Sequence, residues 1–199
     1  CACVISDAGA ANTFGRLLPA EVSRQHGYDD LLSQVKPSVG HLGVYIGLRG
    51  TAAELGLPKT NYWIYPGNDS DAALERYLAD PSSEFPVVYL SFPSAKDPDF
   101  ERRHPGKATI EIVAPVPYEP FAAWAGKTWG KRGEDYEALK KAYGERLLAH
   151  LFDKVPQARR HIDYWEVSTP LSMQWFCGWQ RGELYGLDHD PARMRARWL

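Results

Sequence analysis

Apolar and polar residues alternate along several short stretches of the chain, and one longer stretch repeats its apolar positions with a helical period. Alternation places successive side chains on opposite faces of a strand, and each short stretch is bounded by Gly, Pro or Asn. The pattern predicts five strands, over residues 38–48, 61–65, 85–92, 107–116 and 161–167. It predicts a helix over Glu134–Phe152, where apolar residues form one stripe with charged residues opposite. Gly144 lies within that helix and weakens it by about 1 kcal/mol relative to Ala.

Shorter helical segments are predicted by their capping residues. Residues 70–79 form a helix with Ser70 as its N-cap and an acidic first turn. Further along, Thr169 can cap the free N–H groups of an aromatic helix whose first residue is Pro170. Strand ends that lead into helices are common ligand sites in α/β proteins. Cys177 in this helix is expected to be a small buried residue, as free cysteines usually are.

The chain opens with a continuous apolar run, Cys1–Ser6, that ends at Asp7. Such runs are typical of a parallel strand covered on both faces. A folded chain seldom begins on the first residue of a buried strand, so we expect Cys1 to mark a cut made within a domain. A short helix or turn is expected over residues 10–18, and the polar, proline-bearing residues 93–106 are expected to form a loop.

Together these elements predict an α+β fold that is a fragment of a larger α/β protein. We expect a mixed, mainly antiparallel sheet of about five strands with helices on one face, preceded by one strand of another domain. At 199 residues the chain can bury one good core.

Composition narrows the classes of function. Hydrophobic content of 44% and charged content of 24% are typical of a soluble globular protein. A net charge of −2 gives no basic surface for nucleic acid, and no apolar run is long enough to span a membrane. Three cysteines, an odd number, indicate a reducing compartment, so a cytoplasmic location is expected. No second Cys/His pair stands at ligand spacing, and we therefore expect no metal site.

The two faces of the predicted sheet differ in their side chains. One face is aliphatic and suits packing under helices, whereas the other carries Tyr45, Trp63 and Tyr65. Tyr45 stands between Gly43 and Gly47 on its own face, which leaves hollows beside its ring. An aromatic wall of this kind suits a pocket for a long apolar molecule. The alternative, that this face is solvated or packs on another subunit, stays open.

The sequence does not identify a catalytic residue. It contains no GxGxxG, Walker loop, GxSxG or HExxH motif, and its histidines are isolated. An enzyme whose chemistry is carried by a cofactor needs few such residues.

Several segments, in order along the chain, resemble one family of flavin oxidoreductases. They are ACVISDAGAANTFGRLLP at residues 2–19, SVGHLGVYIGLRG at 38–50, NYWIYP at 61–66 and VSTPLSMQWFCGWQRGELYGL at 167–187. The family includes phytoene desaturases, carotenoid isomerases and retinol saturases, and the chain is most similar to its retinol saturase-like, phytoene dehydrogenase-related branch. The family's N-terminal GxGxxG and its C-terminal flavin-contacting segment are absent here.

The resemblance implies a division of the chain and a set of site residues. Residues 1–20 would end an FAD-binding, Rossmann-like domain, 21–185 would form the substrate-binding domain, and 186–199 would return toward the FAD-binding domain. Asp7, Ala8 and Gly9 would lie near the flavin. The substrate channel would be lined by Tyr45, Trp63, Tyr65, Met173, Trp175 and Phe176.

The resemblance also implies a reaction. The whole protein would bind FAD and transfer hydride to or from a conjugated isoprenoid, with NAD(P) as a further donor or acceptor. Desaturation, saturation and isomerisation stay open, and this chain alone would hold little FAD and be inactive. An apolar substrate makes peripheral contact with a membrane an expectation. The alternative is a non-enzymatic α+β module that binds a lipid or a protein partner.

Overall fold

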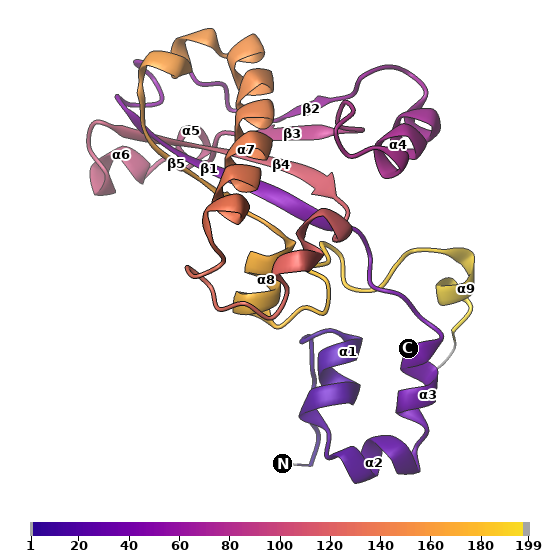
Figure 1. Ribbon diagram of the computed structural model, residues 1–199. Coiled ribbons are helices and arrows are strands. Elements are labelled where there is room, and N and C mark those ends of the chain that lie inside the picture. The colour runs from indigo at the N-terminus through magenta and orange to yellow at the C-terminus, as the bar shows by residue number, and fades with distance from the viewer. Residues whose placement is uncertain (1, 197–199) are drawn as a thin grey trace.

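The computed structural model describes residues 2–196, so Cys1 and the last three residues of the predicted return segment lie outside it. Five strands form one sheet in the order β2-β3-β4-β1-β5 (Figure 1). The strands are β1 (Gly40–Arg49), β2 (Tyr62–Ile64), β3 (Val88–Ser91), β4 (Lys107–Val116) and β5 (Ile162–Ser168). Each overlaps a stretch where alternation predicted a strand, so the α+β class is confirmed. Every pair of neighbouring strands in this sheet is antiparallel, where a mixed sheet was expected.

Helices fall into an N-terminal group and a group around the sheet. The N-terminal group, which lies apart from the sheet in Figure 1, comprises α1 (Ala10–Asn12), a π-helical turn (Thr13–Leu17), α2 (Ala20–Gln25) and α3 (Tyr28–Ser33). The others are α4 (Ser70–Ala79), α5 (Pro93–Lys96), α6 (Phe100–Arg103), α7 (Glu134–Lys154), α8 (Pro170–Cys177) and α9 (Pro191–Met194). Two 3₁₀ turns are Glu119–Trp124 and Pro156–Arg160.

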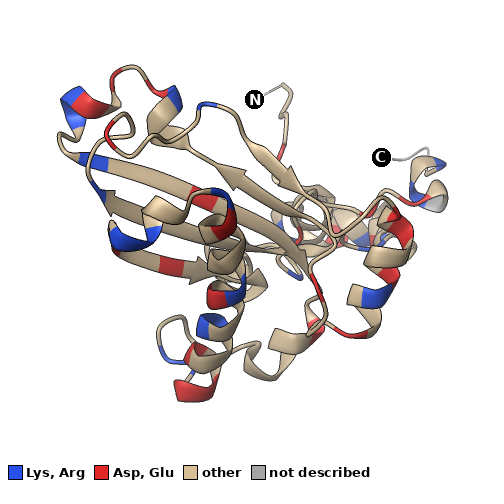
Figure 2. Cartoon of the chain, turned by 90° about the horizontal axis from the view of Figure 1, so that it is seen from above, with Lys and Arg blue, Asp and Glu red and all other residues tan. Residues whose placement is uncertain are grey.

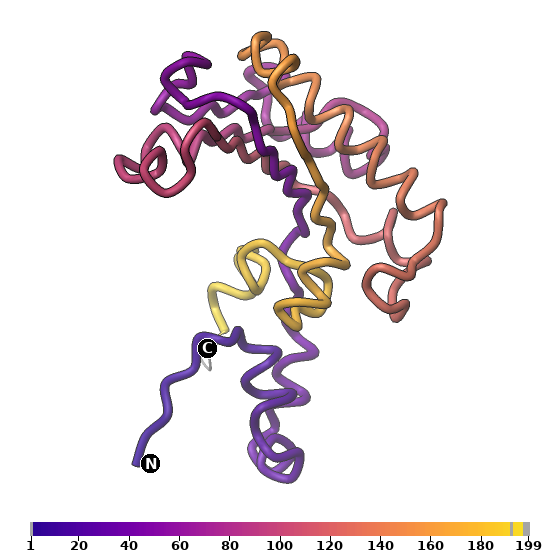
Figure 3. The backbone as a smooth tube through the Cα atoms, turned by 90° about the vertical axis from the view of Figure 1, so that its left-hand side faces the viewer, coloured from indigo at the N-terminus to yellow at the C-terminus, as the bar shows by residue number. Residues whose placement is uncertain are grey.

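The core lies between one face of the sheet and α7, which crosses that face (Figures 1 and 3). Ile110 and Ile112 of β4 and Leu147 and Leu151 of α7 are all buried there. Gly144 has a role that its helix propensity does not indicate. A Cβ atom at this position would lie 2.3 Å from the Trp165 ring, so the absence of a side chain lets α7 approach β5.

Two predicted helix starts are observed, one of them with a different cap. Helix α4 begins at Ser70, but its N-cap is Asp69, whose Oδ1 accepts a hydrogen bond from the Ala72 N–H at 3.0 Å. Helix α8 begins at Pro170 behind Thr169, as predicted. The Thr169 N–H donates to Ser172 Oγ at 3.2 Å, which closes the first turn of α8.

The predicted N-terminal strand is not formed within the described part of the chain. Residues 2–6 have no strand neighbour, and Val4 and Ile5 are 82% and 95% exposed. A strand needs a partner for its backbone groups, and an apolar run needs a covering layer. Residues 7–196 provide no neighbouring strand and no covering layer for residues 2–6. The expected domain boundaries at 20 and 185 stay predictions.

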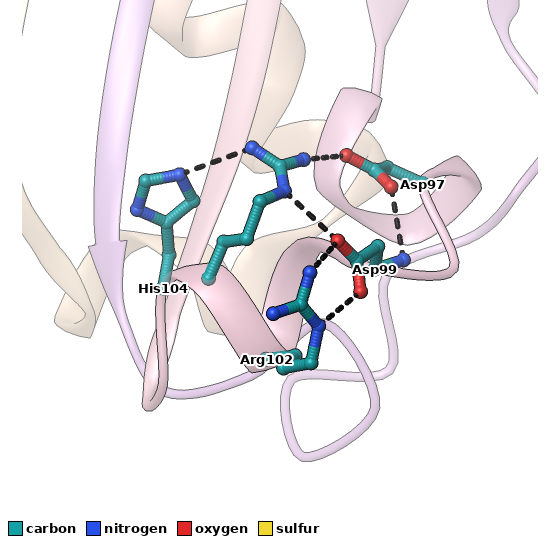
Figure 4. A network of polar contacts seen from close by, with 5 residues as sticks. Asp97, Asp99, Arg102 and His104 are labelled. Atoms are coloured by element: carbon teal, nitrogen blue, oxygen red, sulfur yellow. Dashed lines mark hydrogen bonds and ion pairs between the residues drawn. The ribbon is translucent and has the colours of Figure 1, made fainter.

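The expected loop at residues 93–106 contains α5 and α6, which the sequence analysis did not predict. Figure 4 shows the ion pairs around them: Arg102 binds Asp99 at 2.6 Å, and Arg103 binds both Asp97 and Asp99. Pro93 is the first residue of α5, a position whose N–H would have no partner within the helix, so the missing N–H of proline costs nothing there. The proline that suggested a loop therefore begins a helix. These charge pairs join α6 to the turn that connects it to α5.

A short two-stranded ribbon leads from the sheet toward the N-terminal helices. Leu184 N–H donates to the Val39 carbonyl at 2.9 Å, and Ser38 N–H donates to the Gly186 carbonyl at 2.8 Å. Isolated bridges at Pro37–Leu187 and Gly40–Glu183 belong to the same pairing. The segment after α8 therefore returns along the start of β1 and forms one border of the sheet face that α7 does not cover.

Candidate functional site

The face of the sheet opposite α7 is aromatic and uncovered over much of its area, and we call it the open face. Tyr45 is 41% exposed and Trp63 is 59% exposed, although both lie on strands. The aliphatic residues that alternate with them are buried under α7. In Figure 2 the charged residues lie mainly on helices and connecting loops, and most of each strand is tan. The open face therefore carries large exposed rings, with the carboxylates of Glu111 and Glu166 beside Tyr45.

One hollow at the border of the open face is apolar. We call it the Trp63 groove; its volume is about 370 Å³. It is lined by Val39, Trp63, Val87, Tyr89, Val113, Ala114, Pro115, Leu184 and Tyr185. The Trp63 and Tyr89 rings lie against each other with centroids 4.7 Å apart. No charged side chain belongs to this lining, so the groove suits hydrocarbon.

A second hollow, of about 320 Å³, lies where α8 leaves the sheet, and we call it the Tyr45 groove. It is lined by Tyr45, Trp129, Lys140, Glu166, Val167, Ser168, Ser172, Met173 and Phe176. Trp129 and Phe176 meet edge to face with centroids 5.4 Å apart. Apolar rings and a thioether thus stand beside a few polar groups, which is the usual composition of a small-molecule site.

The Tyr45 side chain lies back along its own strand. A Cβ atom at Gly43 would be 2.9 Å from the Tyr45 hydroxyl, so the ring covers this glycine. Glu111 of β4 and Glu166 of β5 stand directly opposite Tyr45 in the neighbouring strands. Burial raises the pKa of Tyr45, and proximity to Glu111, Glu166 and Cys177 raises it further. The phenol therefore stays protonated at neutral pH and can donate a hydrogen bond.

Helix α8, which carries Met173 and Phe176, is positioned by a buried polar network. Arg132 donates to the Leu171 carbonyl at 3.0 Å and to the Tyr136 hydroxyl at 3.3 Å. The Tyr136 and Thr169 hydroxyls are 2.7 Å apart, and Thr169 is fully buried. A buried guanidinium thus ties the start of α8 to α7. Sequence analysis missed Arg132 because it lies in a glycine-rich loop with no periodic pattern.

The structure brings together some of the predicted channel residues and separates others. Tyr45, Met173 and Phe176 line the Tyr45 groove, and Trp63 lines the other groove. Tyr65 and Trp175 are exposed and belong to the lining of neither groove. Cys177, expected to be buried, is exposed because it lies in the last turn of α8 beside solvent.

Other groove residues were not singled out from the sequence. Glu166, Trp129 and Tyr185 need the strand register or a distant loop to reach the site. Alternation along the sequence places Tyr164, Glu166 and Ser168 on the same side of a strand. It does not show which residues of the neighbouring strands lie beside them.

The turn expected to lie near a flavin packs against the segment that follows α8. Gly9 has φ +83°, and a Cβ atom there would lie 2.5 Å from the Trp179 ring. Arg16 donates to the Gly178 carbonyl at 3.2 Å in the same contact. Asp7 is exposed, and neither groove includes Asp7, Ala8 or Gly9 in its lining. The turn is therefore near the C-terminal end of α8, about one helix length from the Thr169 end.

Two further features concern metals and membranes. Among residues 2–196 no group of three or more His, Cys, Asp or Glu side chains could hold a metal ion. Each described helix is too short or too polar to cross a bilayer.

Comparison with known proteins identifies relatives along nearly the whole chain. No protein-family model matches it. It is 38% identical over 198 residues, 98% of its length, to the "All-trans-retinol 13,14-reductase" of Homo sapiens, and 37% identical over 201 residues to that of Macaca fascicularis. The chain spans about a third of the length of these curated relatives, 32% and 33% respectively. These relatives are retinol saturase-like proteins, the family that the sequence resembles, and the likeness extends over nearly the whole of this chain.

Likeness to the retinol saturase-like family along this segment does not by itself establish activity. The "Inactive all-trans-retinol 13,14-reductase" of Danio rerio is 35% identical over 178 residues, 85% of this chain. A protein named as inactive therefore shares the segment nearly as closely as proteins named as reductases. The activity of any whole protein that contains this chain must be argued from its site.

The flavin that the resemblance implies needs a cradle for its pyrophosphate, which flavin-binding folds place at a helix N-terminus. Three described helices have eight or more residues, and none offers one. The first turn of α4 is capped by the Asp69 carboxylate, and that of α8 is closed by Ser172 and Thr169. The first turn of α7 carries three carboxylates, which repel phosphate. Residues 2–196 therefore do not fit the phosphate end of FAD.

Proposed function

We propose that this chain is the substrate-binding part of an oxidoreductase that acts on a retinoid or a similar polyene. The observation that carries the proposal is the open face, where exposed aromatic rings lie between the apolar Trp63 groove and the Tyr45 groove, which Lys140 of α7 borders. Such a surface can hold a long, flat, apolar molecule and keep water away from it. The names of the relatives support reduction of one double bond as the reaction.

In this proposal the redox chemistry belongs to FAD held by other parts of the whole protein. The absence of a pyrophosphate cradle among the described residues agrees with that division. FAD would supply hydride transfer, with NAD(P) as a further electron donor or acceptor. This chain would bind and orient the polyene, exclude water and, through the turn Asp7–Gly9, approach the flavin near Trp179. Trp175, exposed on α8, and Tyr65 would contact substrate or flavin from the rim.

The proposal also gives a location. Exposed thiols at Cys3 and Cys177 agree with a reducing compartment such as the cytoplasm. A polyene dissolves in the bilayer, so the protein would collect it by peripheral contact with a membrane surface.

The test uses the full-length protein, expressed with the reading frame that flanks this chain and reconstituted with FAD. We expect a flavin absorbance band and, under reducing conditions, loss of one conjugated double bond from all-trans-retinol, followed by chromatography and mass spectrometry. A protein without the flavin band would contradict the oxidoreductase. A flavoprotein that leaves retinol and other polyenes unchanged would contradict the substrate class.

A second candidate is a non-enzymatic module that binds a lipid or a protein partner. The apolar lining of the Trp63 groove supports it, because such a lining can hold a lipid without any redox partner. A GxGxxG motif upstream in the reading frame supports the oxidoreductase, whereas a stop codon or an unrelated domain there supports the module. Binding of retinol without flavin and without turnover would decide for the module.

A further inference from the structure

One row of residues crosses all five strands on the open face. The strand register pairs Trp63 with Tyr89, Tyr89 with Val113, Val113 with Gly43, and Gly43 with Ser168. Neighbouring strands lie about 4.8 Å apart, so the row is about 19 Å long. It runs from the Trp63 groove at one end to the Tyr45 groove at the other. The two grooves are therefore the ends of one track.

Gly43 lies in the row between Val113 and Ser168, and its lack of a side chain makes room for the Tyr45 ring above it. The Tyr45 ring covers Gly43 and stands between the grooves, with its hydroxyl near the position that a Cβ atom would occupy. Val113, on the other side of Gly43, is only partly buried. A flat molecule that lies along this row therefore contacts the Tyr45 ring where it passes Gly43.

The two ends of the track differ in chemistry. The Trp63 groove presents hydrocarbon and aromatic rings, whereas the other end presents the Tyr45 and Ser168 hydroxyls with Glu166 and Lys140 near them. Tyr45 makes no hydrogen bond with any described residue, and its raised pKa keeps the phenol proton in place. A free donor at one end and an apolar hollow at the other match a molecule with one polar terminus.

We infer that the row from Trp63 to Ser168 is the floor of a site for a polyene alcohol, with its hydrocarbon end in the Trp63 groove and its hydroxyl at Tyr45. The inference rests on the proposed function and deepens it, because it assigns recognition of the terminal hydroxyl to Tyr45 and gives the substrate a direction across the sheet. An extended retinoid is comparable in length to the track. The site selects the alcohol over a polyene hydrocarbon, because only the alcohol can pair with the phenol.

The experiment measures equilibrium binding to the full-length protein by quenching of tryptophan fluorescence. The two probes are all-trans-retinol and a polyene hydrocarbon of matching length without the hydroxyl. Tyr45→Phe removes the donor and keeps the ring, so the affinity for retinol is expected to fall about 3- to 10-fold while that for the hydrocarbon is unchanged. Tyr28→Phe is the matched control: it removes a phenol in the N-terminal helices, outside both grooves, and leaves both affinities unchanged.

Two further variants test the floor of the site and its apolar end. Trp63→Ala removes the wall of the apolar groove, so the affinities for both probes are expected to fall together, by about tenfold or more. Gly43→Ala adds a methyl group where the Tyr45 hydroxyl now lies. It is expected to displace the phenol and reduce the preference for retinol as Tyr45→Phe does.

The outcomes separate this inference from the proposed function, which is measured as flavin content and retinol conversion in the same preparations. If the wild type converts retinol but Tyr45→Phe and Trp63→Ala leave both affinities intact, the inference fails and the proposed function stands. If Trp63→Ala lowers thermal stability without changing either affinity, another part of the whole protein covers the open face, and the inference fails. If neither probe binds the wild type, both proposals fail.

Discussion

The two faces of one sheet show how this chain separates stability from binding. Ile112 and Val113 are consecutive residues of β4, yet Ile112 is fully buried under α7 and Val113 faces the Trp63 groove. The same contrast holds on β1, where buried Val44 and Ile46 flank exposed Tyr45. Packing on α7 buries the aliphatic side chains of one face. The other face can then carry large rings that the fold does not need, which leaves them free to meet a ligand.

Shortening one side chain on each face of the sheet is expected to give the largest difference in stability. Ile112→Ala leaves a cavity in a close-packed core, and the free energy of unfolding is expected to fall by about 3–4 kcal/mol. Val113→Ala, one residue away, removes a partly exposed side chain and is expected to cost less than about 1 kcal/mol. Urea unfolding of the whole protein, followed by circular dichroism, measures both. Similar losses for the two variants would mean that the open face is also a packed interface.

Substitution of Gly144 tests how closely α7 packs against the buried face of the sheet. Gly144→Ala raises helix propensity by about 1 kcal/mol but forces a methyl group against Trp165 and Val167, so a net loss of about 1–2 kcal/mol is expected. Gly67→Ala is the matched control, because a Cβ atom there meets open space. Its effect should stay within about 0.5 kcal/mol in the same urea titration. A gain in stability at Gly144 would show that the helix can move away from β5 at no cost.

The same glycine shows how far the sequence can predict this fold and where prediction stops. The stripe along α7, the five strands and the start of α8 at Pro170 follow from local periodicity and capping, so they were predictable. The close contact of Gly144 with Trp165 depends on a helix–strand distance that no local pattern contains. The sequence shows a glycine in a helix and indicates only a weakening.

The candidate site was predictable to a similar degree. Alternation alone placed Tyr45 and Trp63 on one aromatic face, and the glycines beside Tyr45 indicated the hollow. It could not show that Trp63 and Ser168 are ends of one row, because register is set by pairing between distant strands. A continuous apolar run also predicted a strand over Cys1–Ser6, but residues 2–6 have no strand neighbour within the described chain and do not form one.

Substitution of Tyr77 in α4 tests how far a buried polar group without a hydrogen-bond partner lowers the stability of the protein. Its hydroxyl is buried and has no hydrogen-bond partner among the described residues. Tyr77→Phe removes that hydroxyl and keeps the ring, so the free energy of unfolding is expected to rise by about 1 kcal/mol. Tyr65→Phe, on the exposed rim, should change it very little.

The pH dependence of the same variant has a definite sign. Burial raises the pKa of Tyr77 in the folded protein above the value of about 10 for an unfolded tyrosine. The stability that comes from keeping this phenol neutral is present below pH 10 and is lost as the pH rises above it. Tyr77→Phe should therefore retain more of its stability at pH 11 than the wild type in alkaline urea titrations. Equal losses for the two proteins would mean that water reaches the hydroxyl.

The smallest expected effect lies at the edge of the open face. Asp163 pairs with Arg49 of β1 and with Lys107 of β4, the latter at 3.2 Å, so it joins charges across three strands. Hydrogen bonds from Arg49 and Lys107 lower the pKa of Asp163. The contribution of ionised Asp163 to stability is therefore present at pH values above the ordinary aspartate pKa of about 4. It is lost as the pH falls through the lowered pKa of Asp163 in the folded protein.

Exposed pairs of this kind are screened by water and salt, so Asp163→Asn should move the urea midpoint only slightly at pH 7. The small difference from wild type should shrink at high salt and vanish at acid pH, because protonation removes the charge in the wild type too. A loss as large as that of Ile112→Ala would contradict the contrast between the faces. It would show that the open side of the sheet depends on its charges as the covered side depends on α7.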